Sequence, residues 1–143
     1  MKILIGAMIV GLLLCGELQA RELAIIANKS YPFNQITVEA LKEIYKGEKT
    51  VVGGTRIHPL DQKEPVIKKV FLNEIVGKSI DQYNVYWIKR VFQEGGVPPE
   101  IKSGSDDVLD TITHGTGAVG YVWKSEAAGR EDIKILLTIE VNH

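Results

Sequence analysis

The stretch from Gly115 to Val122, which reads GTGAVGYV, constrains the fold of this chain more than any other segment. A segment with helical periodicity ends at Gly115, and a short apolar strand begins directly after Gly117. Glycine adopts positive φ without strain and lets another backbone or a ligand approach closely. We therefore expect these glycines to form a tight reversal from a helix into a buried strand, a corner that is typical of α/β domains.

The first twenty residues have the composition of a secretion signal. Lys2 carries the positive charge, residues 3–14 are apolar, and Ala20 is a small residue of the kind that precedes a cleavage site. The apolar run is shorter than the about 20 residues that a membrane-spanning helix needs. We therefore expect residues 1–20 to be a signal peptide cleaved after Ala20, and residues 21–143 to be one exported, periplasmic domain with no transmembrane segment.

The single cysteine of the chain, Cys15, lies inside this leader. A lipoprotein signal places a small residue before the lipidated cysteine, but here Leu14 precedes it. Cleavage after Ala20 is therefore favoured over a lipid anchor at Cys15, and both remain open. The exported domain then has no cysteine, so packing of its core must stabilise it in place of disulfides.

Apolar and amphipathic patterns alternate along residues 21–143. Strands are expected at residues 23–27, 56–61, 118–123 and 133–141, and helices are expected after Thr37, at Pro65, and after Ser79 and Ser105. Strands separated by helices predict a mixed, largely parallel sheet flanked by helices. The fold class is therefore α/β, in a single domain without repeats or linkers.

Some finer expectations concern side-chain placement. Pro59 is expected to push its strand toward a sheet edge or an early end, because proline donates no amide hydrogen. In the strand at 133–141, alternate residues are expected on one face, with Leu136 out of pattern. For the rings of Tyr83, Tyr86 and Trp87, core packing is favoured over an exposed contact face.

Charge and composition exclude several classes of function. The net charge is −1 with mixed signs, which gives no support for a nucleic-acid surface. The chain has neither the spacing of a zinc site nor a nucleophile elbow, a Walker loop or a dinucleotide glycine pattern. Asp106, Asp107 and Asp110 are favoured as charges that complement a helix dipole over paired catalytic acids, and His114 as a cation at a helix end. We therefore expect no enzyme, no catalytic residue, no metal and no cofactor.

Taken in order, the predicted segments resemble the phosphate-type substrate-binding proteins of ABC transporters. The matching features are the strand at 23–27 with the proline-containing loop after Asn28, the segment TVEALKEIYKG from Thr37, the strand and helix across 57–71, and GAVGYV from Gly117. The resemblance covers residues 23–124. It implies a periplasmic-binding-protein-like fold, a role in transport, and a small oxyanion such as phosphate as the ligand.

Two departures from the family's pattern bear on function. The usual receptor has two lobes that close over the ligand, whereas this chain is long enough for one lobe. The family's phosphate loop is of a Ser-Gly-Thr-Arg type, whereas residues 61–66 here read DQKEPV. Lys63 is the only cation in that stretch, and it lacks the planar fork with which arginine binds an oxyanion.

Two functions remain open. The first is a solute-binding module that takes phosphate or a similar oxyanion to an ABC transporter permease. Its ligand-binding residues would lie where strands meet helices, at Asn28, Ser30, Asp61, Gln62 and Lys63. The second is an envelope adaptor, or protein-interaction module, that reuses the fold and binds no small ligand. The first is placed ahead because the resemblance is to binding proteins.

Overall fold

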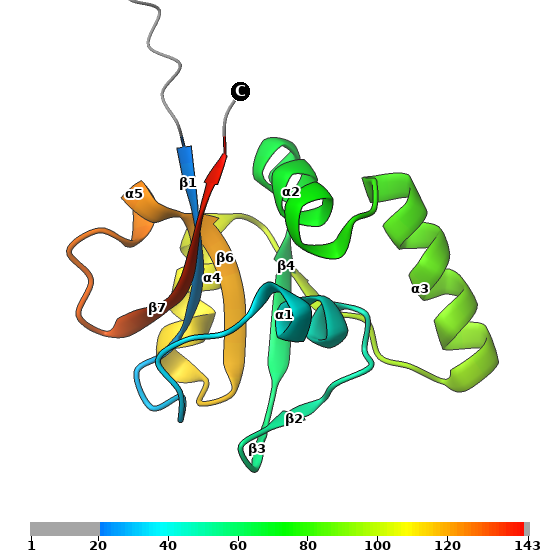
Figure 1. Ribbon diagram of the computed structural model, residues 1–143, viewed down its shortest axis with the longest axis horizontal. Helices are drawn as coiled ribbons and strands as arrows, with labels where there is room; N and C mark the ends of the chain where they lie inside the picture. The colour runs from blue at the N-terminus through cyan, green and yellow to red at the C-terminus, as the bar shows by residue number, and fades with distance from the viewer. Residues whose placement is uncertain (1–20, 142–143) are drawn as a thin grey trace, which may run out of the picture.

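Five strands form one sheet at the centre of the molecule (Figure 1). The computed structural model describes residues 21–141, so the predicted signal peptide, Cys15 and His143 lie outside the described residues. In spatial order the strands are β5 (Glu100–Lys102), β4 (His58–Gln62), β6 (Ala118–Trp123), β1 (Arg21–Asn28) and β7 (Ile133–Val141). A separate hairpin consists of β2 (Val51–Val52) and β3 (Thr55–Arg56).

Four of the five strands run in one direction. β4 pairs in parallel with β5 and β6, whereas β1 is antiparallel to both β6 and β7, so β7 runs the same way as the other three. The prediction of a mixed, largely parallel α/β sheet is confirmed. β1 has a strand on each side, and residues 23–27 are fully buried, as expected of a continuous apolar run.

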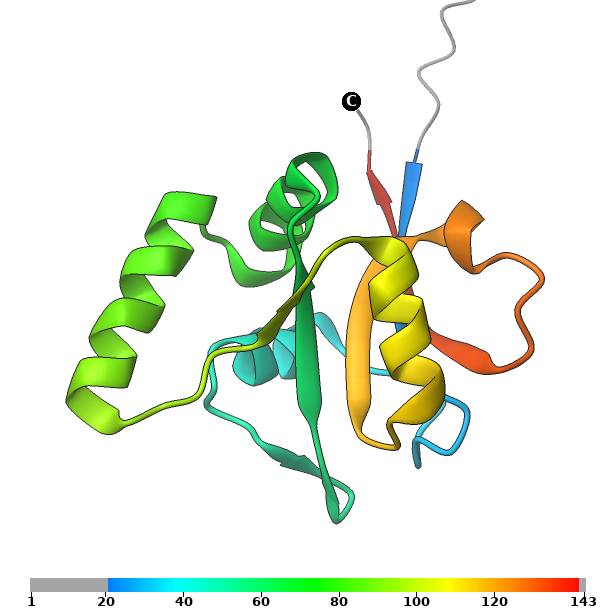
Figure 2. The same ribbon diagram turned by 180° about the vertical axis from the view of Figure 1, so that it is seen from behind.

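Helices cover both faces of the sheet (Figures 1 and 2). On one face lie α1 (Val38–Tyr45), α2 (Pro65–Phe71) and the π-helical turn η1 (Leu72–Val76), and on the other lies α4 (Ser105–His114). Each face has its own buried apolar cluster. α3 (Ile80–Glu94) stands to the side of β4, and the short α5 (Lys124–Ala127) follows β6. Within residues 21–141, no helix has the length and apolar character needed to cross a bilayer.

Three of the predicted helix starts are confirmed by their caps. The Thr37 hydroxyl accepts a hydrogen bond from an amide in the first turn of α1, and Pro65 opens α2. Ser79 and Gln82 form the predicted capping box, in which each side chain accepts from the other residue's amide. These local signals therefore position α1, α2 and α3.

The fourth predicted cap is wrong. Gly104, and not Ser105, is the N-cap of α4. The Ser105 hydroxyl instead donates to Glu126 in α5, at 2.9 Å. The Ser105 hydroxyl, which local spacing predicted as a helix cap, therefore binds Glu126, 21 residues further along the sequence.

The glycines of the 115–122 corner allow close approach and do not adopt positive φ. All glycines with positive φ among the described residues lie elsewhere, and Gly115 has a φ of −126°. A Cβ on Gly117 would lie 2.0 Å from the Arg56 carbonyl oxygen, and one on Gly120 would lie 2.7 Å from Val108 Cγ1. The tight reversal is confirmed, but the reason for it is steric and not conformational.

Pro59 neither places its strand at a sheet edge nor ends it early, because β4 lies between β5 and β6 and continues to Gln62. At the level of Pro59, β4 pairs with β6 alone, since its pairing with β5 begins at Leu60. The His58 amide donates toward β6, to the Gly117 carbonyl at 2.8 Å, so strand alternation turns the Pro59 nitrogen toward the other side. Proline is tolerated there because no ladder hydrogen bond is lost.

β7 has the predicted bounds but not the predicted alternation. Ile25 of β1 pairs with Leu137 and Ile26 pairs with Ile135, so Leu136 is the extra residue of a β-bulge. As a result Leu136 is buried, whereas Ile135 is 37% exposed. The bulge changes which side chains face the core, and a strict period of two could not include it.

The aromatic rings of α3 pack inward. Tyr83 and Trp87 are buried, and Tyr86 is half-buried. The Tyr83 hydroxyl donates to the Tyr45 carbonyl at 2.5 Å, and the Tyr86 hydroxyl donates to the Lys46 carbonyl at 2.6 Å. The preference for core packing over an exposed aromatic face is confirmed, and the phenols bind the last carbonyls of α1.

Candidate functional site

Three neighbouring strands end at the same edge of the sheet, and a helix follows each of them. Because β4, β5 and β6 are parallel, their carboxyl ends meet where α2, α4 and α5 begin. In open α/β sheets ligands bind outside the carboxyl ends of the strands, where helix N-termini offer free amide groups. We call the last residues of these three strands and the first turns of these three helices the carboxyl edge.

The predicted site residues fall at two opposite ends of the sheet. Asp61, Gln62 and Lys63 lie at the carboxyl edge, at the end of β4. Asn28 and Ser30 follow β1, which runs antiparallel to β6 and therefore ends at the far side. The structure thus brings three of the five residues together and does not bring Asn28 and Ser30 to them.

Asn28 and Ser30 are engaged with each other and with α4. The Asn28 side-chain nitrogen, Nδ2, donates to the carbonyls of Ile112 and Thr113 at 2.7 and 3.2 Å, near the end of that helix. The Asn28 side-chain oxygen accepts from both the amide and the hydroxyl of Ser30. This pair therefore joins the loop after β1 to the C-terminal end of α4.

Asp61 lies in a buried polar network. Its carboxylate accepts from the Tyr121 hydroxyl at 2.5 Å and from the Gln62 amide at 2.8 Å, and it pairs with Lys68 Nζ at 3.1 Å. Burial, and after it the charge of Asp61, raises the pKa of the Tyr121 hydroxyl well above its ordinary value, so that the hydroxyl remains a donor. Sequence reasoning did not single out Lys68, whose place in the last turn of α2 brings its ammonium to this carboxylate.

Gln62 and Lys63 differ in how much of each remains accessible. Gln62 is fully buried, and its side-chain nitrogen donates to the Tyr121 carbonyl at 2.8 Å. Its side-chain oxygen has no hydrogen-bond partner within the described part of the chain. Lys63 is exposed, and its backbone amide donates to the Lys102 carbonyl at 2.9 Å. Lys63 therefore presents its ammonium group to solvent beside the end of β5.

Carboxylates within the chain already occupy donors at the carboxyl edge. Glu64 accepts from the Val66 amide at 3.2 Å, at the start of α2. Asp107 accepts from the amide and the hydroxyl of Ser103 at 3.0 and 3.2 Å, and these hydrogen bonds lower its pKa. These carboxylates use the donors that an oxyanion would otherwise bind.

Glu126 makes the same kind of contact between two helices. Its carboxylate accepts from the Trp123 amide and from the Ser105 hydroxyl, each at 2.9 Å. Glu126 therefore bridges the start of α5 and the start of α4 in the way that a bound anion would.

Lys102 and Glu126 belong to the carboxyl edge and Ser103 adjoins it, but none of the three is in the predicted site. Lys102 Nζ lies 2.9 Å from Glu100 and 3.9 Å from Asp107. β5 has only three residues and shows no period, so the sequence does not reveal that it pairs with β4. The run Lys-Ser-Gly-Ser at 102–105, directly before an amphipathic helix, was the available signal.

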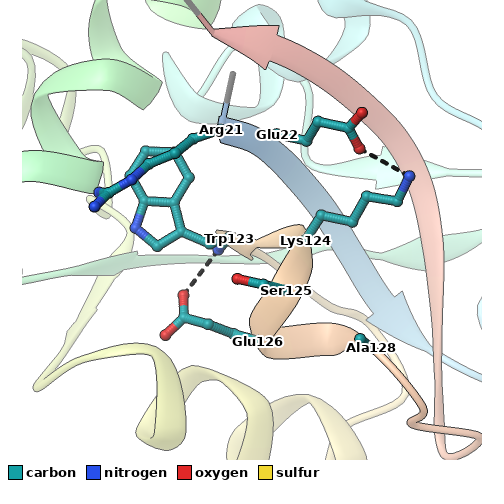
Figure 3. A pocket seen from close by; sticks show the side chains of 7 residues that line it. All are labelled: Arg21, Glu22, Trp123, Lys124, Ser125, Glu126 and Ala128. Atoms are coloured by element: carbon teal, nitrogen blue, oxygen red, sulfur yellow. Dashed lines mark hydrogen bonds and ion pairs between the residues drawn. The ribbon is translucent and has the colours of Figure 1, made fainter. Parts of the chain in front are cut away.

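A surface cavity of about 690 Å³ adjoins the carboxyl edge (Figure 3). Its charged side chains are largely paired: Lys124 contacts Glu22 at 2.8 Å, and the Arg21 guanidinium lies 5.1 Å from the centre of the Trp123 ring. A second cavity, of about 350 Å³, lies between α3 and β5. Within residues 21–141, no cluster of three histidine, cysteine or acidic side chains is arranged to hold a metal ion.

Comparison with known proteins identifies the fold. No protein-family model matches the chain, and no curated protein matches its sequence. Solved structures do match: an ABC-type phosphate transport receptor from Vibrio cholerae is 20% identical with a TM-score of 0.61, over 83% of this chain and 46% of that one.

Two further structures agree with this match. A putative phosphate ABC transporter substrate-binding protein with bound phosphate, from Clostridium perfringens, is 18% identical with a TM-score of 0.64, over 83% of this chain and 45% of that one. PstS from Borrelia burgdorferi is 17% identical with a TM-score of 0.60, over 82% and 47%. The predicted resemblance is therefore confirmed as a likeness of fold, and the chain spans slightly under half the length of these binding proteins.

Proposed function

We propose that this chain is a solute-binding module for an ABC transporter and that it binds phosphate or a similar small oxyanion at the carboxyl edge. The observation that carries the proposal is that three parallel strands bring three helix starts and two lysines together in a fold shared with phosphate-binding proteins. Asp61 and Gln62 support the site from within, since both are buried. An ABC transporter permease would be the partner.

Lys63 and Lys102 supply the positive charge in this proposal. The Lys63 amide bonds the Lys102 carbonyl, so the two residues are adjacent across the ends of β4 and β5. Contact with Glu100 raises the pKa of Lys102, so that residue stays cationic. Lys63 is exposed and is the lysine that an incoming anion meets first.

Glu126 competes with the ligand in this arrangement. Its carboxylate occupies the Ser105 hydroxyl and the Trp123 amide, so an oxyanion that uses those donors must displace it. Loss of the Glu126 charge is therefore expected to tighten anion binding, whereas loss of the Lys63 charge is expected to weaken it.

Isothermal titration calorimetry with phosphate, sulfate and molybdate tests the proposal. We expect Lys63→Met to weaken phosphate binding roughly tenfold and Glu126→Gln to strengthen it several-fold, in line with charge-assisted hydrogen bonds. Lys29→Met is the matched control, because it removes an equal charge beside Ser30 at the far end of the sheet. An effect of Lys29→Met alone would move the site to the Asn28–Ser30 loop.

The internal carboxylates also favour a second function, that of an envelope adaptor without a small ligand. Glu64, Asp107 and Glu126 satisfy donors that an oxyanion would otherwise use. If neither the unaltered protein nor the Glu126→Gln variant gives heat with any of the three anions, oxyanion binding is excluded. Capture of an envelope protein from a membrane extract would then support the adaptor.

A further inference from the structure

Exposed apolar side chains gather along α3 and β5. Of the eleven large apolar side chains exposed in the described residues, six lie between residues 85 and 101. Phe92 and Val97 are the most exposed, at 87% and 85%. The six, which we call the α3–β5 patch, are Val85, Ile88, Val91, Phe92, Val97 and Ile101.

The patch is continuous across the two elements. Val85, Ile88 and Phe92 recur at helical spacing on one side of α3, away from the buried Tyr83 and Trp87. Ile88 and Ile101 line the same 350 Å³ cavity, together with Pro98 and Pro99 of the segment that joins α3 to β5. An apolar groove therefore runs from the outer side of the helix to the edge strand.

β5 is the end strand of the sheet, and within residues 21–141 it pairs with β4 alone. Its other side presents backbone amides and carbonyls that can pair with a further strand. The opposite end strand, β7, is protected by its bulge and by the loop before α1, whose Ile36 amide donates to the Leu136 carbonyl. The open edge is thus the one that adjoins the apolar groove.

The sequence of β5 is complementary to itself. When two copies of β5 pair in an antiparallel manner about a two-fold axis at Ile101, each Glu100 lies opposite Lys102 of the second copy, on one face of the sheet. On the other face Ile101 lies opposite its own copy. Asp61 pairs with Ile101 in register and both line the α3 cavity, so this is the face on which α3 lies.

We infer that the α3–β5 patch is a homodimer interface, in which β5 pairs with β5 of a second copy and α3 covers the joined sheets. Side chains of these types at these exposures present an apolar area on the order of 600 Å², at the upper end of what monomers expose. A standard interface buries about 800 Å² on each partner. The apolar patch alone would supply most of that area, and the inferred contact would be isologous, as two-fold dimers require.

Charge reversal in β5 tests the inference by sedimentation over micromolar concentrations of the protein expressed from its full sequence. We expect the unaltered protein to be a dimer. Glu100→Lys and Lys102→Glu should each be monomeric, because like charges then face each other across the axis. An equimolar mixture of the two variants should dimerise again, because every lysine of the first variant's β5 then faces a glutamate of the second variant's β5.

The mixture distinguishes loss of pairing between chains from loss of the Glu100–Lys102 contact within each chain. That internal contact stays broken in both variants, so only pairing between chains can restore the dimer. Phe92→Asp and Val85→Asp should also give monomers, whereas Val51→Asp, in β2 and about as exposed as Val85, should leave the dimer intact. Circular dichroism confirms that each variant is folded. A monomeric unaltered protein, or a mixture that fails to restore the dimer, overturns the inference.

Discussion

At Gly117 the structure leaves no room for a side chain. A Cβ there would lie 2.0 Å from a backbone oxygen of residue 56, which cannot move aside as a flexible side chain can. We expect Gly117→Ala to lower the free energy of unfolding by about 3 kcal/mol or more, by forcing β6 away from the start of β4. Urea denaturation followed by tryptophan fluorescence measures the change.

Gly104→Ser is the control for that substitution. A Cβ on Gly104 meets no atom within 4 Å, its φ of 173° is extended, and serine is a favourable residue at a helix N-cap. The free energy of unfolding of the Gly104→Ser variant should be nearly unchanged. Equal effects at the two positions would contradict the steric account of the 115–122 corner.

Individual site residues show where sequence reasoning stops. The sequence marks the end of β4 as a candidate position, because polar residues there interrupt an apolar pattern directly before a helix, and the structure places it at the carboxyl edge. The burial of Asp61 was not predictable, since it depends on Lys68 and on Tyr121, sixty residues further on. Glu126 could not be found for the same reason, because its contact with Ser105 depends on the arrangement of two helices.

Among the elements, α3 is attached by the buried rings of Tyr83 and Trp87 and by polar groups that bind the end of α1. The hydroxyls of Tyr83 and Tyr86 donate to the carbonyls of Tyr45 and Lys46. Arg90 Nη2 donates to the Gly47 carbonyl at 3.0 Å. We expect Arg90→Met to cost about 1 kcal/mol and to speed amide hydrogen exchange in the second half of α3. Exchange measured by mass spectrometry on peptides covering residues 86–94 tests this.

Lys89→Met is the matched control, because Lys89 is exposed on the same turn of the helix. It should leave exchange in α3 unchanged. If both variants exchange alike, Arg90 has no part in holding the helix.

Long elements were predictable and short ones were not. β1, β6, β7 and the four main helices carry enough apolar periodicity and capping residues to be read from the sequence. β5, with three residues, and α5, with four, exist because their neighbours position them. The bulge at Leu136 depends likewise on pairing with β1, so the alternation of β7 alone could not predict it.

For the molecule as a whole, three buried phenols predict a loss of stability at alkaline pH. Burial raises the pKa of Tyr45, Tyr83 and Tyr121 above the ordinary value of 10.0, so the fold favours their neutral forms. The three neutral phenols contribute fully to the free energy of unfolding below about pH 10. This contribution is lost as the pH rises further, because the unfolded chain then binds fewer protons than the folded one. The free energy of unfolding, measured by urea denaturation, should be nearly constant from about pH 7 to about pH 10 and should fall between about pH 10 and 11.5.

Tyrosine absorbance gives an independent check on that profile. In the folded protein, part of the phenolate signal should appear only together with unfolding. Full ionisation of all tyrosines before the fold is lost would show that these hydroxyls are not buried in solution.

The position of β1 also determines when this protein can fold. Among the described strands, β1 is the first in sequence and pairs with the last two, β6 and β7: Leu23 with Trp123, and Arg21 with Val141. Closing loops of such length is slow, and local contacts cannot substitute for it. During synthesis the apolar residues 23–27 therefore stay uncovered, and accessible to chaperones, until residues 118–141 have emerged. β1, an interior strand of the sheet, is thus among the last elements to be completed, although it is the first strand that the structure describes.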